Sequence, residues 1–447
     1  MAKKIAVFGL GKSGLSAMKL LSHLKDQVFL VNRGQFETWP DREEIEKYVD
    51  QSHCLSQEDP DTANLLTTMD EIILSPGIAR EHEILRAALD RGVSVINEIE
   101  LALRYLSAPV IAVTGTNGKT TTVSLIQEMM EKSGINSFLG GNIGVPLSDH
   151  ALAVLKGENQ ASVLVLELSS FQLESLPSLA PKAACILNIY PNHGERYTST
   201  DDYTLAKLNI YKKMDSMSTL YLPKDDEYLS RLAQNIPCQS VTLSTRESHV
   251  LDCLKEYDLS GFKLLGEHNL SNLMFATSLA KEAGATKEGI QAAMNSFCGV
   301  EYRLEYLETG LDCTIYNDAK STNWDATLVA LKSFEKRSAP LHLILGGALR
   351  GRGDEIAPYF EEIEKACDKV YLIGQAAKTL NQEISLRDKH SLEIEVCENL
   401  KEVYDRVVDS GYKGDLLFSP AFPSFDQYAN YIERGKDFRA IFSGKND

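Results

Sequence analysis

The chain lacks the features of several large protein classes. Its 447 residues contain no apolar run that approaches the roughly 20 residues a membrane helix needs. It carries 46 Lys and Arg against 63 Asp and Glu, so its formal net charge is −17. This charge argues against a protein that binds nucleic acid or an anionic membrane surface, because either partner needs a cationic face. A local basic pocket for a phosphorylated small molecule remains compatible with it.

Closely spaced cysteines are also missing. The nearest pairs among the eight cysteines are Cys238 with Cys253 and Cys298 with Cys313. The chain therefore has no Cys-x-x-Cys pair, no zinc-ribbon spacing and no disulfide framework. Its first residues, Met1–Ile5, lead into a strand-like stretch without the apolar region of a signal peptide. We expect a soluble, cytoplasmic protein with reduced cysteines.

Short runs rich in Val, Ile and Leu recur along the chain and alternate with longer amphipathic segments. Short, continuously apolar strands between helices are typical of parallel sheets that are covered on both faces. The sequence therefore predicts the α/β class. The runs that we expect to form strands are Ile5–Leu10, Val28–Val31, Ile72–Leu74, Val110–Val113, Val163–Leu168, Ala184–Ile189, Leu341–Leu345, Val370–Ile373 and Leu416–Phe418.

The length suggests about three domains, at roughly 150 residues for each. A strand–helix pattern restarts at Pro109 and the strand after it, which places a first boundary near Asn97 and Glu98. Helical Ile290–Phe297 gives way to strand-like Leu304–Leu307, which places a second boundary near Val300. We therefore expect three domains, at residues 1–97, 98–300 and 301–447.

A glycine-rich turn, Gly-Leu-Gly-Lys-Ser-Gly at Gly9–Gly14, follows the first expected strand and precedes helix-like Leu15–Leu24. Such a turn exposes backbone N–H groups at a helix N-terminus, which suits a diphosphate. A nicotinamide cofactor would need an acidic residue after the second strand, where the chain has Asn32 and Arg33. The turn is compatible with a nicotinamide cofactor, with another nucleoside diphosphate ligand or with a purely structural role.

A second loop, Gly-Thr-Asn-Gly-Lys-Thr at Gly115–Thr120, lies between the expected strand Val110–Val113 and a helix that extends to about Met130. Its backbone N–H groups can surround phosphates, its lysine can meet the outer ones, and its last threonine can bind Mg²⁺. Val113 stands where the general eight-residue pattern has its first glycine. The loop predicts a site for the phosphates of ATP, and the alternative is a chance glycine-rich turn.

Two further side chains follow strands that we expect beside this loop. Glu167 ends the strand Val163–Leu168, in the position where phosphate-loop enzymes hold their metal ion. His193 follows the strand Ala184–Ile189. The alternatives are a solvated carboxylate at a strand end and a surface histidine.

The ordered set of motifs resembles the Mur ligase family. The set comprises Gly-Thr-Asn-Gly-Lys-Thr, Gly-Gly-Asn-Ile-Gly at Gly140–Gly144, Leu-Glu-Leu-Ser-Ser-Phe-Gln-Leu at Leu166–Leu173, His268-Asn269, Asn-Asp-Ala-Lys-Ser-Thr-Asn at Asn317–Asn323, Ser419-Pro420-Ala421, Ser-Phe-Asp-Gln-Tyr at Ser424–Tyr428 and Arg434-Gly435. The resemblance covers nearly the whole chain. It implies a Rossmann-like domain for a UDP moiety, a central phosphate-loop ATPase-like domain and a second Rossmann-like domain for an incoming amino acid.

The resemblance also implies roles for individual residues. ATP would contact Gly115, Thr116, Asn117, Gly118, Lys119, Thr120, Thr121, Asn272, Arg303 and Asp318. Magnesium would be held by Thr120, Glu167, His193 and a carbamylated Lys207, and the catalytic set would be Lys119, Glu167, His193 and Lys207. Uridine diphosphate would contact Gly11, Lys12, Ser13, Asn32, Arg33, Ser75 and Gly77, and Asn142 would reach the sugar-peptide. The incoming amino acid would meet Lys320, Thr322, Ser424 and Tyr431.

The implied reaction is ATP-dependent amide formation in the synthesis of peptidoglycan precursors. ATP would convert the L-alanyl carboxylate of UDP-N-acetylmuramoyl-L-alanine to an acyl phosphate, which the amine of D-glutamate would then attack. The enzyme would act as a monomer with ATP and Mg²⁺. From the residues alone, Lys207 is one basic residue on an amphipathic helix, and its alternative interpretation is a solvated face.

Some positions depart from the family pattern. Tyr302 stands where a histidine commonly precedes Arg303, and Tyr431 stands where Phe is expected. The segment after His193 reads Gly194-Glu195-Arg196, where a bulky apolar residue and Asp are more usual, and Glu195 is the acidic residue that could take the place of that Asp. Two arginines, Arg350 and Arg352, occupy the turn in which some members use a lysine to anchor the glutamate side chain.

Three other interpretations remain open. The first is a related ligase with another acceptor, either a folylpolyglutamate synthase or a muramyl ligase that adds a diamino acid. The second is a regulatory protein that hydrolyses ATP without ligation, which the presence of Glu167, His193 and Lys207 disfavours. The third is a nicotinamide-dependent dehydrogenase, which the missing carboxylate after Val31 disfavours.

Overall fold

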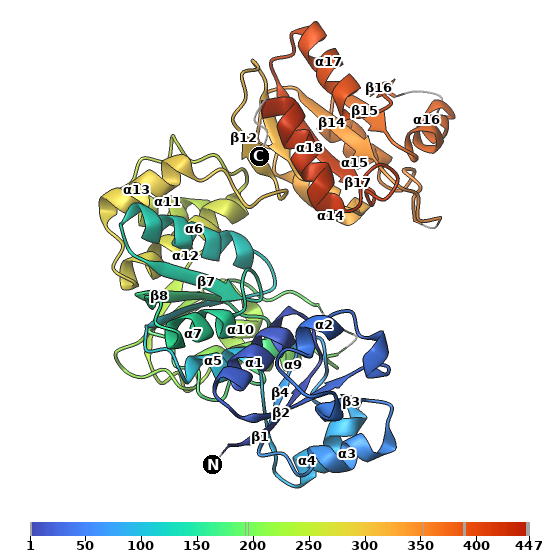
Figure 1. Ribbon diagram of the computed structural model, residues 1–447. Helices are drawn as coiled ribbons and strands as arrows, with labels where there is room; N and C mark the ends of the chain where they lie inside the picture. Colours follow the sequence, from blue (N-terminus) through green and yellow to red (C-terminus); the bar gives the residue numbers. More distant parts are fainter. Residues whose placement is uncertain (1, 193, 195, 352, 388–389, 444–447) are drawn as a thin grey trace. The chain divides into compact units, whose positions relative to one another are not determined.

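The computed structural model describes residues 2–192, 194, 196–351, 353–387 and 390–443. It contains three sheets, which confirms the predicted α/β class. The chain divides into two compact units. Unit 1 comprises the residues up to Tyr257 together with Ser271–Ala293, and unit 2 comprises Asp258–Leu270 together with the residues from Met294 onward. Figure 1 draws the helices and strands of both units and labels many of them.

The first sheet, in unit 1, has five strands in the order β3-β2-β1-β4-β5, and its strands pair in parallel. Alternate residues of these strands enter hydrophobic clusters on opposite faces, with Ile5 and Val7 in one cluster and Ala6 and Phe8 in another. Burial on both faces explains the continuous apolar runs of the sequence. The strands are β1 (Lys4–Phe8), β2 (Gln27–Asn32), β3 (Cys54–Ser56), β4 (Glu71–Leu74) and β5 (Ser94–Ile96), and the helices are α1 (Lys12–His23), α2 (Arg42–Ile45), α3 (Pro60–Leu66), α4 (Arg86–Asp90) and α5 (Glu98–Leu103).

The second sheet, also in unit 1, has six strands in the order β11-β10-β9-β6-β8-β7, again with parallel pairing. Its strands are β6 (Val110–Thr114), β7 (Ser137–Gly141), β8 (Val163–Glu167), β9 (Ala183–Ile186), β10 (Thr219–Pro223) and β11 (Gln239–Leu243). Its helices are α6 (Lys119–Lys132), α7 (Leu147–Leu155), α8 (Ser170–Leu173), α9 (Thr200–Leu208), α10 (Glu227–Leu232), α11 (Glu247–Leu254), α12 (Glu267–Glu282) and α13 (Lys287–Ser296). The first residues of α12 and the last residues of α13 belong to unit 2.

Within unit 1, polar contacts join helices of the first sheet to segments of the second sheet. Asn97, which caps the N-terminus of α5, donates from Nδ2 to the carbonyl oxygen of Gln172 at 2.7 Å. The carboxylate of Glu98 accepts a hydrogen bond from the backbone N–H of Ser148 in α7. Ser16 of α1 donates to Asp149 of α7 at 2.7 Å. Helices α1, α5 and α7 therefore form one packed layer.

The third sheet lies in unit 2 and has the strand order β12-β13-β17-β14-β15-β16. Its strands pair in parallel except that β12 is antiparallel to β13, a departure from the all-parallel pattern of the other two sheets. Its strands are β12 (Glu305–Leu307), β13 (Thr314–Asn317), β14 (Leu341–Gly346), β15 (Lys369–Ile373), β16 (Glu393–Val396) and β17 (Asp415–Ala421). Its helices are α14 (Trp324–Lys332), α15 (Phe360–Ala366), α16 (Ala377–Ser385), α17 (Leu400–Ser410) and α18 (Tyr431–Ser443).

Hydrophobic clusters cover both faces of this third sheet, with Leu343 and Leu417 in one cluster and Ile344 and Phe418 in another. Because β13 to β17 are parallel to one another, their carboxyl ends meet at one edge of the sheet, where doubly wound sheets bind their ligands. Among the residues that the structure describes, no helix has the length and apolar character needed to cross a membrane.

Candidate active site

The loop between β6 and α6 has the geometry of a phosphate loop. Gly118 has φ +84° in the left-handed region and occupies the N-cap position of α6, which favours glycine. The Lys119 ammonium donates to the carbonyl oxygens of Gly115 and Thr116, both at 2.9 Å. The lysine side chain thus folds back over the loop. Positive charge and the N-terminus of a 14-residue helix coincide here, and this combination suits an anion.

Asn272 contacts this loop from α12. A Cβ atom added to Gly118 would lie 2.3 Å from Asn272 Oδ1, so a side chain at position 118 would displace the amide. Asn272 is buried. The structure therefore brings together two of the predicted ATP contacts that are separated by more than 150 positions of sequence.

Asn188 supports the loop from the other side, and sequence reasoning missed it. Its Oδ1 accepts a hydrogen bond from Asn117 N at 2.9 Å, and its backbone oxygen accepts one from Thr116 N at 3.0 Å. Its Nδ2 also donates to Asn117 O at 3.2 Å. Its place directly after β9, in the segment that leads to His193, was the available signal.

Glu167 ends β8 beside the start of α6. Its Oε2 accepts a hydrogen bond from Thr120 Oγ1 at 2.8 Å, and its Oε1 accepts one from Asn142 Nδ2 at 2.9 Å. Glu167 is almost completely buried. A Cβ on Gly141 would lie 2.2 Å from the Glu167 carbonyl oxygen, so the Gly-Gly-Asn turn needs glycine to approach β8. Three predicted residues, Thr120, Asn142 and Glu167, form one hydrogen-bonded cluster.

Lys207 of α9 lies within the same region and is only 1% exposed. Its Nζ lies 3.4 Å from Thr114 Oγ1, at the end of β6, and 4.5 Å from the centre of the Tyr203 ring. Burial, together with the charge of Lys119, lowers the pKa of Lys207 to about 6, although the charge of Glu167 opposes this change. The alternative interpretation of Lys207, a basic residue on a solvated helix face, is therefore wrong.

Thr121 lies in the first turn of α6, partly buried. His193, which we predicted as a catalytic and metal-binding residue, lies outside the described residues, as do Glu195 and Arg352. Within the part of the chain that the structure describes, no group of three or more His, Cys, Asp or Glu side chains could hold a metal ion.

The glycine-rich turn of the first sheet lies at the carboxyl ends of β1 and β4. Ser75 donates from Oγ to the Gly9 carbonyl oxygen at 2.7 Å, which ties the two strand ends together. A Cβ atom at Gly11 or at Gly77 would meet no protein atom within 4 Å. The protein's own packing therefore does not require glycine at these two positions, and both leave open space above the backbone.

The other predicted residues of this turn are more exposed. Lys12 and Ser13 begin α1, with Lys12 exposed and Ser13 partly buried. Asn32 ends β2, and Arg33 follows it with a side chain 89% exposed and 4.0 Å from Glu58. These residues share the carboxyl edge of the first sheet, because β1 lies between β2 and β4.

In unit 2, Asp318 follows β13 and is buried. It accepts hydrogen bonds from Leu304 N at 3.1 Å and from Ser419 Oγ at 2.7 Å. Burial raises the pKa of Asp318 to about 6, although its hydrogen bonds from Ser321 and Ser419 oppose this change. Arg303, exposed, lies next to Leu304 on the same turn. Asp318 therefore fixes the turn that carries Arg303.

The predicted amino-acid contacts gather at the carboxyl edge of the third sheet. Arg350 donates from Nη1 to the Thr322 carbonyl oxygen at 3.0 Å. The Lys320 ammonium lies 5.8 Å from the centre of the Tyr431 ring. Ser424, buried, accepts a backbone hydrogen bond from Tyr428 at 2.9 Å.

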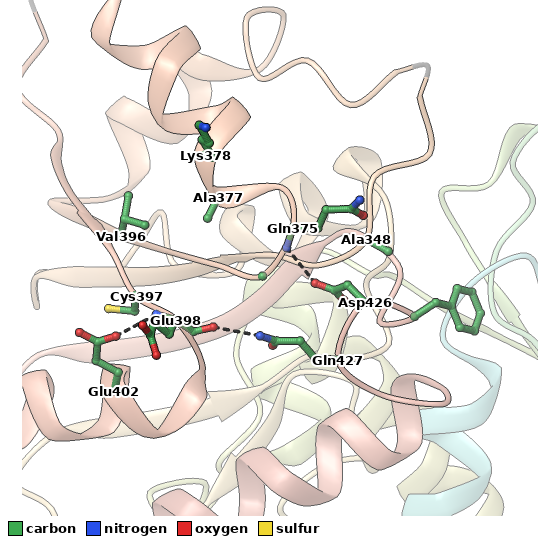
Figure 2. Close-up of a pocket in the computed structure, with 12 residues that line it drawn as sticks. Ala348, Gln375, Ala377, Lys378, Val396, Cys397, Glu398, Glu402, Asp426 and Gln427 are labelled. Carbon is green, nitrogen blue, oxygen red and sulfur yellow. Dashed lines mark hydrogen bonds between the residues drawn. The ribbon is translucent and has the colours of Figure 1, made fainter.

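A pocket of about 1170 Å³ opens beside these residues. Figure 2 shows its polar groups bonded to one another: Gln375 N donates to Asp426 at 2.9 Å, and Gln427 Nε2 donates to the Glu398 carbonyl oxygen at 2.9 Å. Among the described residues, its lining includes Phe425 and Asp426 but none of the predicted amino-acid contacts.

A phosphate loop in a parallel sheet, with one sheet of Rossmann type before it along the chain and another after it, defines an α/β phosphate-loop protein. Models of three domains match the chain: a Mur ligase MurD-like N-terminal domain at residues 3–97, a Mur ligase middle domain at residues 113–280 and a Mur ligase glutamate ligase domain at residues 302–420. The chain belongs to the Mur ligase family.

Curated relatives agree with this assignment, and a solved structure shows the same fold. A UDP-N-acetylmuramoylalanine–D-glutamate ligase of Desulfatibacillum aliphaticivorans is 38% identical over 85% of this chain and 85% of its own length. The enzyme of the same name from Thermoanaerobacter pseudethanolicus is 30% identical over 98% and 97%. A MurF ligase from Thermotoga maritima in complex with ADP shares the fold at 15% identity, with a TM-score of 0.54 over 98% of this chain and 94% of its own.

Proposed function

We propose that this protein is an ATP-dependent ligase that joins D-glutamate to UDP-N-acetylmuramoyl-L-alanine, in the synthesis of peptidoglycan precursors. The observation that carries the proposal is the cluster of Thr120, Asn142, Glu167 and Lys207 at the mouth of the phosphate loop. The names of the curated relatives support the choice of substrates.

ATP binds at the loop in this proposal. The backbone N–H groups at the start of α6 meet its phosphates, and the Lys119 ammonium moves its hydrogen bonds from the loop carbonyls to the outer phosphates. Asn272, which touches Gly118, contacts the adenine. Arg303 and Asp318 of unit 2 are assigned to the phosphate and the ribose.

The oxygens of Thr120 and Glu167 suit a hard cation. They lie within hydrogen-bonding distance of each other at the junction of β8 and α6, and Mg²⁺ prefers oxygen ligands. His193 completes the set that we propose. When bound, Mg²⁺ neutralises phosphate charge, which lets two anions approach each other. The oxygens of Thr120 and Glu167 therefore fit the ion, which takes one or two protein ligands together with the oxygens of substrate phosphates and water.

Lys207 is carbamylated in this proposal. Its buried amine, with a pKa of about 6, carries no proton for most of the time at neutral pH. The nitrogen lone pair forms a C–N bond to CO₂, and one proton leaves to solvent. The product is a carbamate, which places an anion where the neutral amine stood beside Glu167, and its two oxygens suit the same metal ion.

The chemistry takes place in two steps. The L-alanyl carboxylate attacks the γ-phosphorus of ATP, the bond to ADP breaks, and an acyl phosphate forms. The amine of D-glutamate then attacks the acyl carbon, a tetrahedral intermediate forms, and phosphate leaves as the amide is made and a proton is released. Lys119 offsets the repulsion between carboxylate and phosphate, and Asn142 holds the sugar-peptide near its reacting carboxylate.

Two binding regions hold the other substrates. The open space above Gly11 and Gly77 lets a uridine diphosphate approach the backbone, with Lys12, Ser13 and Ser75 around it. D-Glutamate binds in unit 2, where Ser424 takes its α-carboxylate. Thr322 and Arg350 take its side-chain carboxylate, since Arg350 is already bonded to Thr322.

The assignments to Asn32, Arg33, Lys320 and Tyr431 complete this proposal. So does the division into a UDP-binding domain at residues 1–97, an ATP-binding domain at 98–300 and an amino-acid-binding domain at 301–447. We further propose that the protein acts as a monomer in the cytoplasm.

One assay tests the reaction and its acceptor. ADP release is measured with UDP-N-acetylmuramoyl-L-alanine and each of D-glutamate, L-glutamate, L-lysine and meso-diaminopimelate. We expect release that depends on both the nucleotide-sugar and D-glutamate, with the amide product detected by mass spectrometry. Equal rates with another amino acid would overturn the assigned acceptor. ADP release in the absence of both the nucleotide-sugar and an amino acid would indicate an ATPase.

A further inference from the structure

Arg434 of α18 is a buried cation, and it lies outside the set of residues assigned above. It is 1% exposed and is the largest fully buried side chain of the described residues. Its Nη1 donates to the carbonyl oxygen of Phe422 and its Nη2 to that of Ala319, both at 3.0 Å. Both of these hydrogen-bond partners are thus backbone oxygens that belong to separate loops at the carboxyl edge of the third sheet.

A third loop also meets this guanidinium. A Cβ atom on Gly347, in the turn after β14, would lie 3.0 Å from Arg434 Nη1 and 2.2 Å from the Pro423 carbonyl oxygen. Gly347 has φ +146°, so the turn passes the arginine with bare backbone. Arg434 therefore lies where the loops after β13, β14 and β17 converge.

Backbone hydrogen bonds connect the same three loops. Ala348 N donates to Pro423 O at 2.8 Å, and Ala421 N donates to Ser321 O at 3.1 Å. Each loop also carries residues of the proposed amino-acid pocket: Lys320 and Thr322 on the first, Arg350 on the second and Ser424 on the third. The position of each pocket side chain thus depends on how these loops meet.

A stabilising role alone accounts poorly for an arginine at this place. Burying a guanidinium costs free energy, and carbonyl oxygens repay it less well than a carboxylate. Its Nε has no hydrogen-bond partner within the described structure. What the guanidinium offers is a rigid planar fork whose two ends reach two oxygens at a fixed spacing, which a lysine ammonium cannot reproduce.

We propose that Arg434 is a positioning residue for the amino-acid substrate, which holds the three loops in the register that the pocket of Lys320, Thr322, Arg350 and Ser424 requires. This inference rests on the proposed function, because it assumes that the pocket takes D-glutamate. The substrate that the pocket would bind is an amino acid with two carboxylates, and two carboxylates need hydrogen-bond donors from more than one loop.

The first test is kinetic and uses the full chain. Arg434→Lys keeps the charge but loses the fork, so we expect its KM for D-glutamate to rise about tenfold while its KM for ATP changes less than about twofold. Arg337→Lys is the matched control, because Arg337 forms a two-bond ion pair with Asp415 at the other end of β17. The control should lower thermal stability without changing the KM for D-glutamate.

The second test needs no substrate. Hydrogen exchange of the unliganded protein follows the amides of Ala348 and Ala421, which report the contacts between loops. In Arg434→Lys both should exchange at least about tenfold faster, while the Leu417 amide within β17 should keep its protection. Unchanged exchange at both amides would overturn the proposal, whatever the enzyme's substrate.

The outcomes separate the two proposals. A wild-type protein that releases no ADP with D-glutamate contradicts the proposed function, and the exchange experiment still decides whether Arg434 holds the loops. An active wild-type enzyme with an unchanged KM for D-glutamate in Arg434→Lys contradicts only the positioning role. Arg434→Gln, which buries no charge, is the second variant, and failure of both variants to fold would show a folding role and overturn the proposal.

Discussion

The carboxyl group of Glu98 makes the stability of unit 1 depend on pH. Glu98 is the first residue of α5, is 4% exposed and accepts a hydrogen bond from Ser148 N. Burial raises the pKa of Glu98 from 4.5 to about 7, with a contribution from the charge of Asp149, although the hydrogen bonds from Ser148 oppose it. We expect Glu98→Gln to remove this dependence.

The sign follows from proton binding. Below pH 4.5 the carboxyl is protonated in both the folded and the unfolded chain. Between 4.5 and about 7 the unfolded chain loses this proton while the folded chain keeps it, so the free energy of unfolding falls as pH rises. At about 1.4 kcal/mol per pH unit, the full penalty above pH 7 is about 3 kcal/mol.

Urea-induced unfolding of the wild-type protein and Glu98→Gln measures this effect, with the transition of unit 1 followed from about pH 5 to about pH 8.5. The glutamine retains an oxygen that accepts from Ser148 N but cannot ionise. The variant should gain stability over the wild type as pH rises, by up to about 3 kcal/mol. Glu131→Gln, at an exposed carboxylate of the same unit, should track the wild type. Parallel curves for the wild type and Glu98→Gln would refute the reasoning.

Three further predictions concern the proposed site. Lys119→Ala should reduce ADP release by about a hundredfold or more with an unchanged circular dichroism spectrum, because the outer phosphates lose their cation. Lys132→Ala, at an exposed lysine in the last turn of the same helix, is the control and should release ADP at the wild-type rate. A rate close to that of the wild type in Lys119→Ala would contradict the assignment. Lys207→Ala should be nearly inactive, should recover some activity with added short carboxylates, and should lack the carbamate signal that we expect ¹³C NMR to detect in the wild type under labelled CO₂. The control variant Lys212→Ala, at an exposed lysine, should keep that signal. A Lys207→Ala variant that is fully active without additive would exclude the carbamate. Ser424→Ala should raise the KM for D-glutamate about tenfold and leave the KM for ATP nearly unchanged, because a hydrogen bond to a charged group contributes about 1.5–3 kcal/mol. Initial-rate kinetics with each substrate varied in turn measure both constants, and an unchanged KM for D-glutamate with a raised KM for ATP would contradict the assignment.

The α/β class was predictable because burial on both faces makes a strand continuously apolar. Strands at sheet edges escaped this signal: β16 (Glu393–Val396) alternates glutamates with apolar residues and is not fully buried. The antiparallel pairing of β12 left no mark in the composition of either strand. The domain limits and the ligand contacts stay predictions.

The cluster around Glu167 was predictable in outline because its members follow neighbouring parallel strands, whose ends meet at one edge. Asn188 was missed, because its one signal was its place after β9, and a single asparagine in a loop has no distinctive spacing. The role of Arg434 could not be read from its Arg-Gly pair either, since its partners are backbone oxygens of residues 12 and 115 positions away. The depressed pKa of Lys207 likewise depends on burial that the pattern of its helix did not show.

The division of the chain between its two units has a consequence for cutting the protein into fragments. The segment Asp258–Leu270 belongs to unit 2, although the residues on either side of it along the chain belong to unit 1. Within unit 2, the Lys263 ammonium lies 5.4 Å from the Tyr306 ring, and Leu265 packs against the hydrophobic cluster that contains Leu343. A fragment that begins at residue 301 would leave this segment behind and expose the apolar surface it covers. Separate expression of the C-terminal unit therefore requires a permuted chain, or a second peptide that supplies these 13 residues.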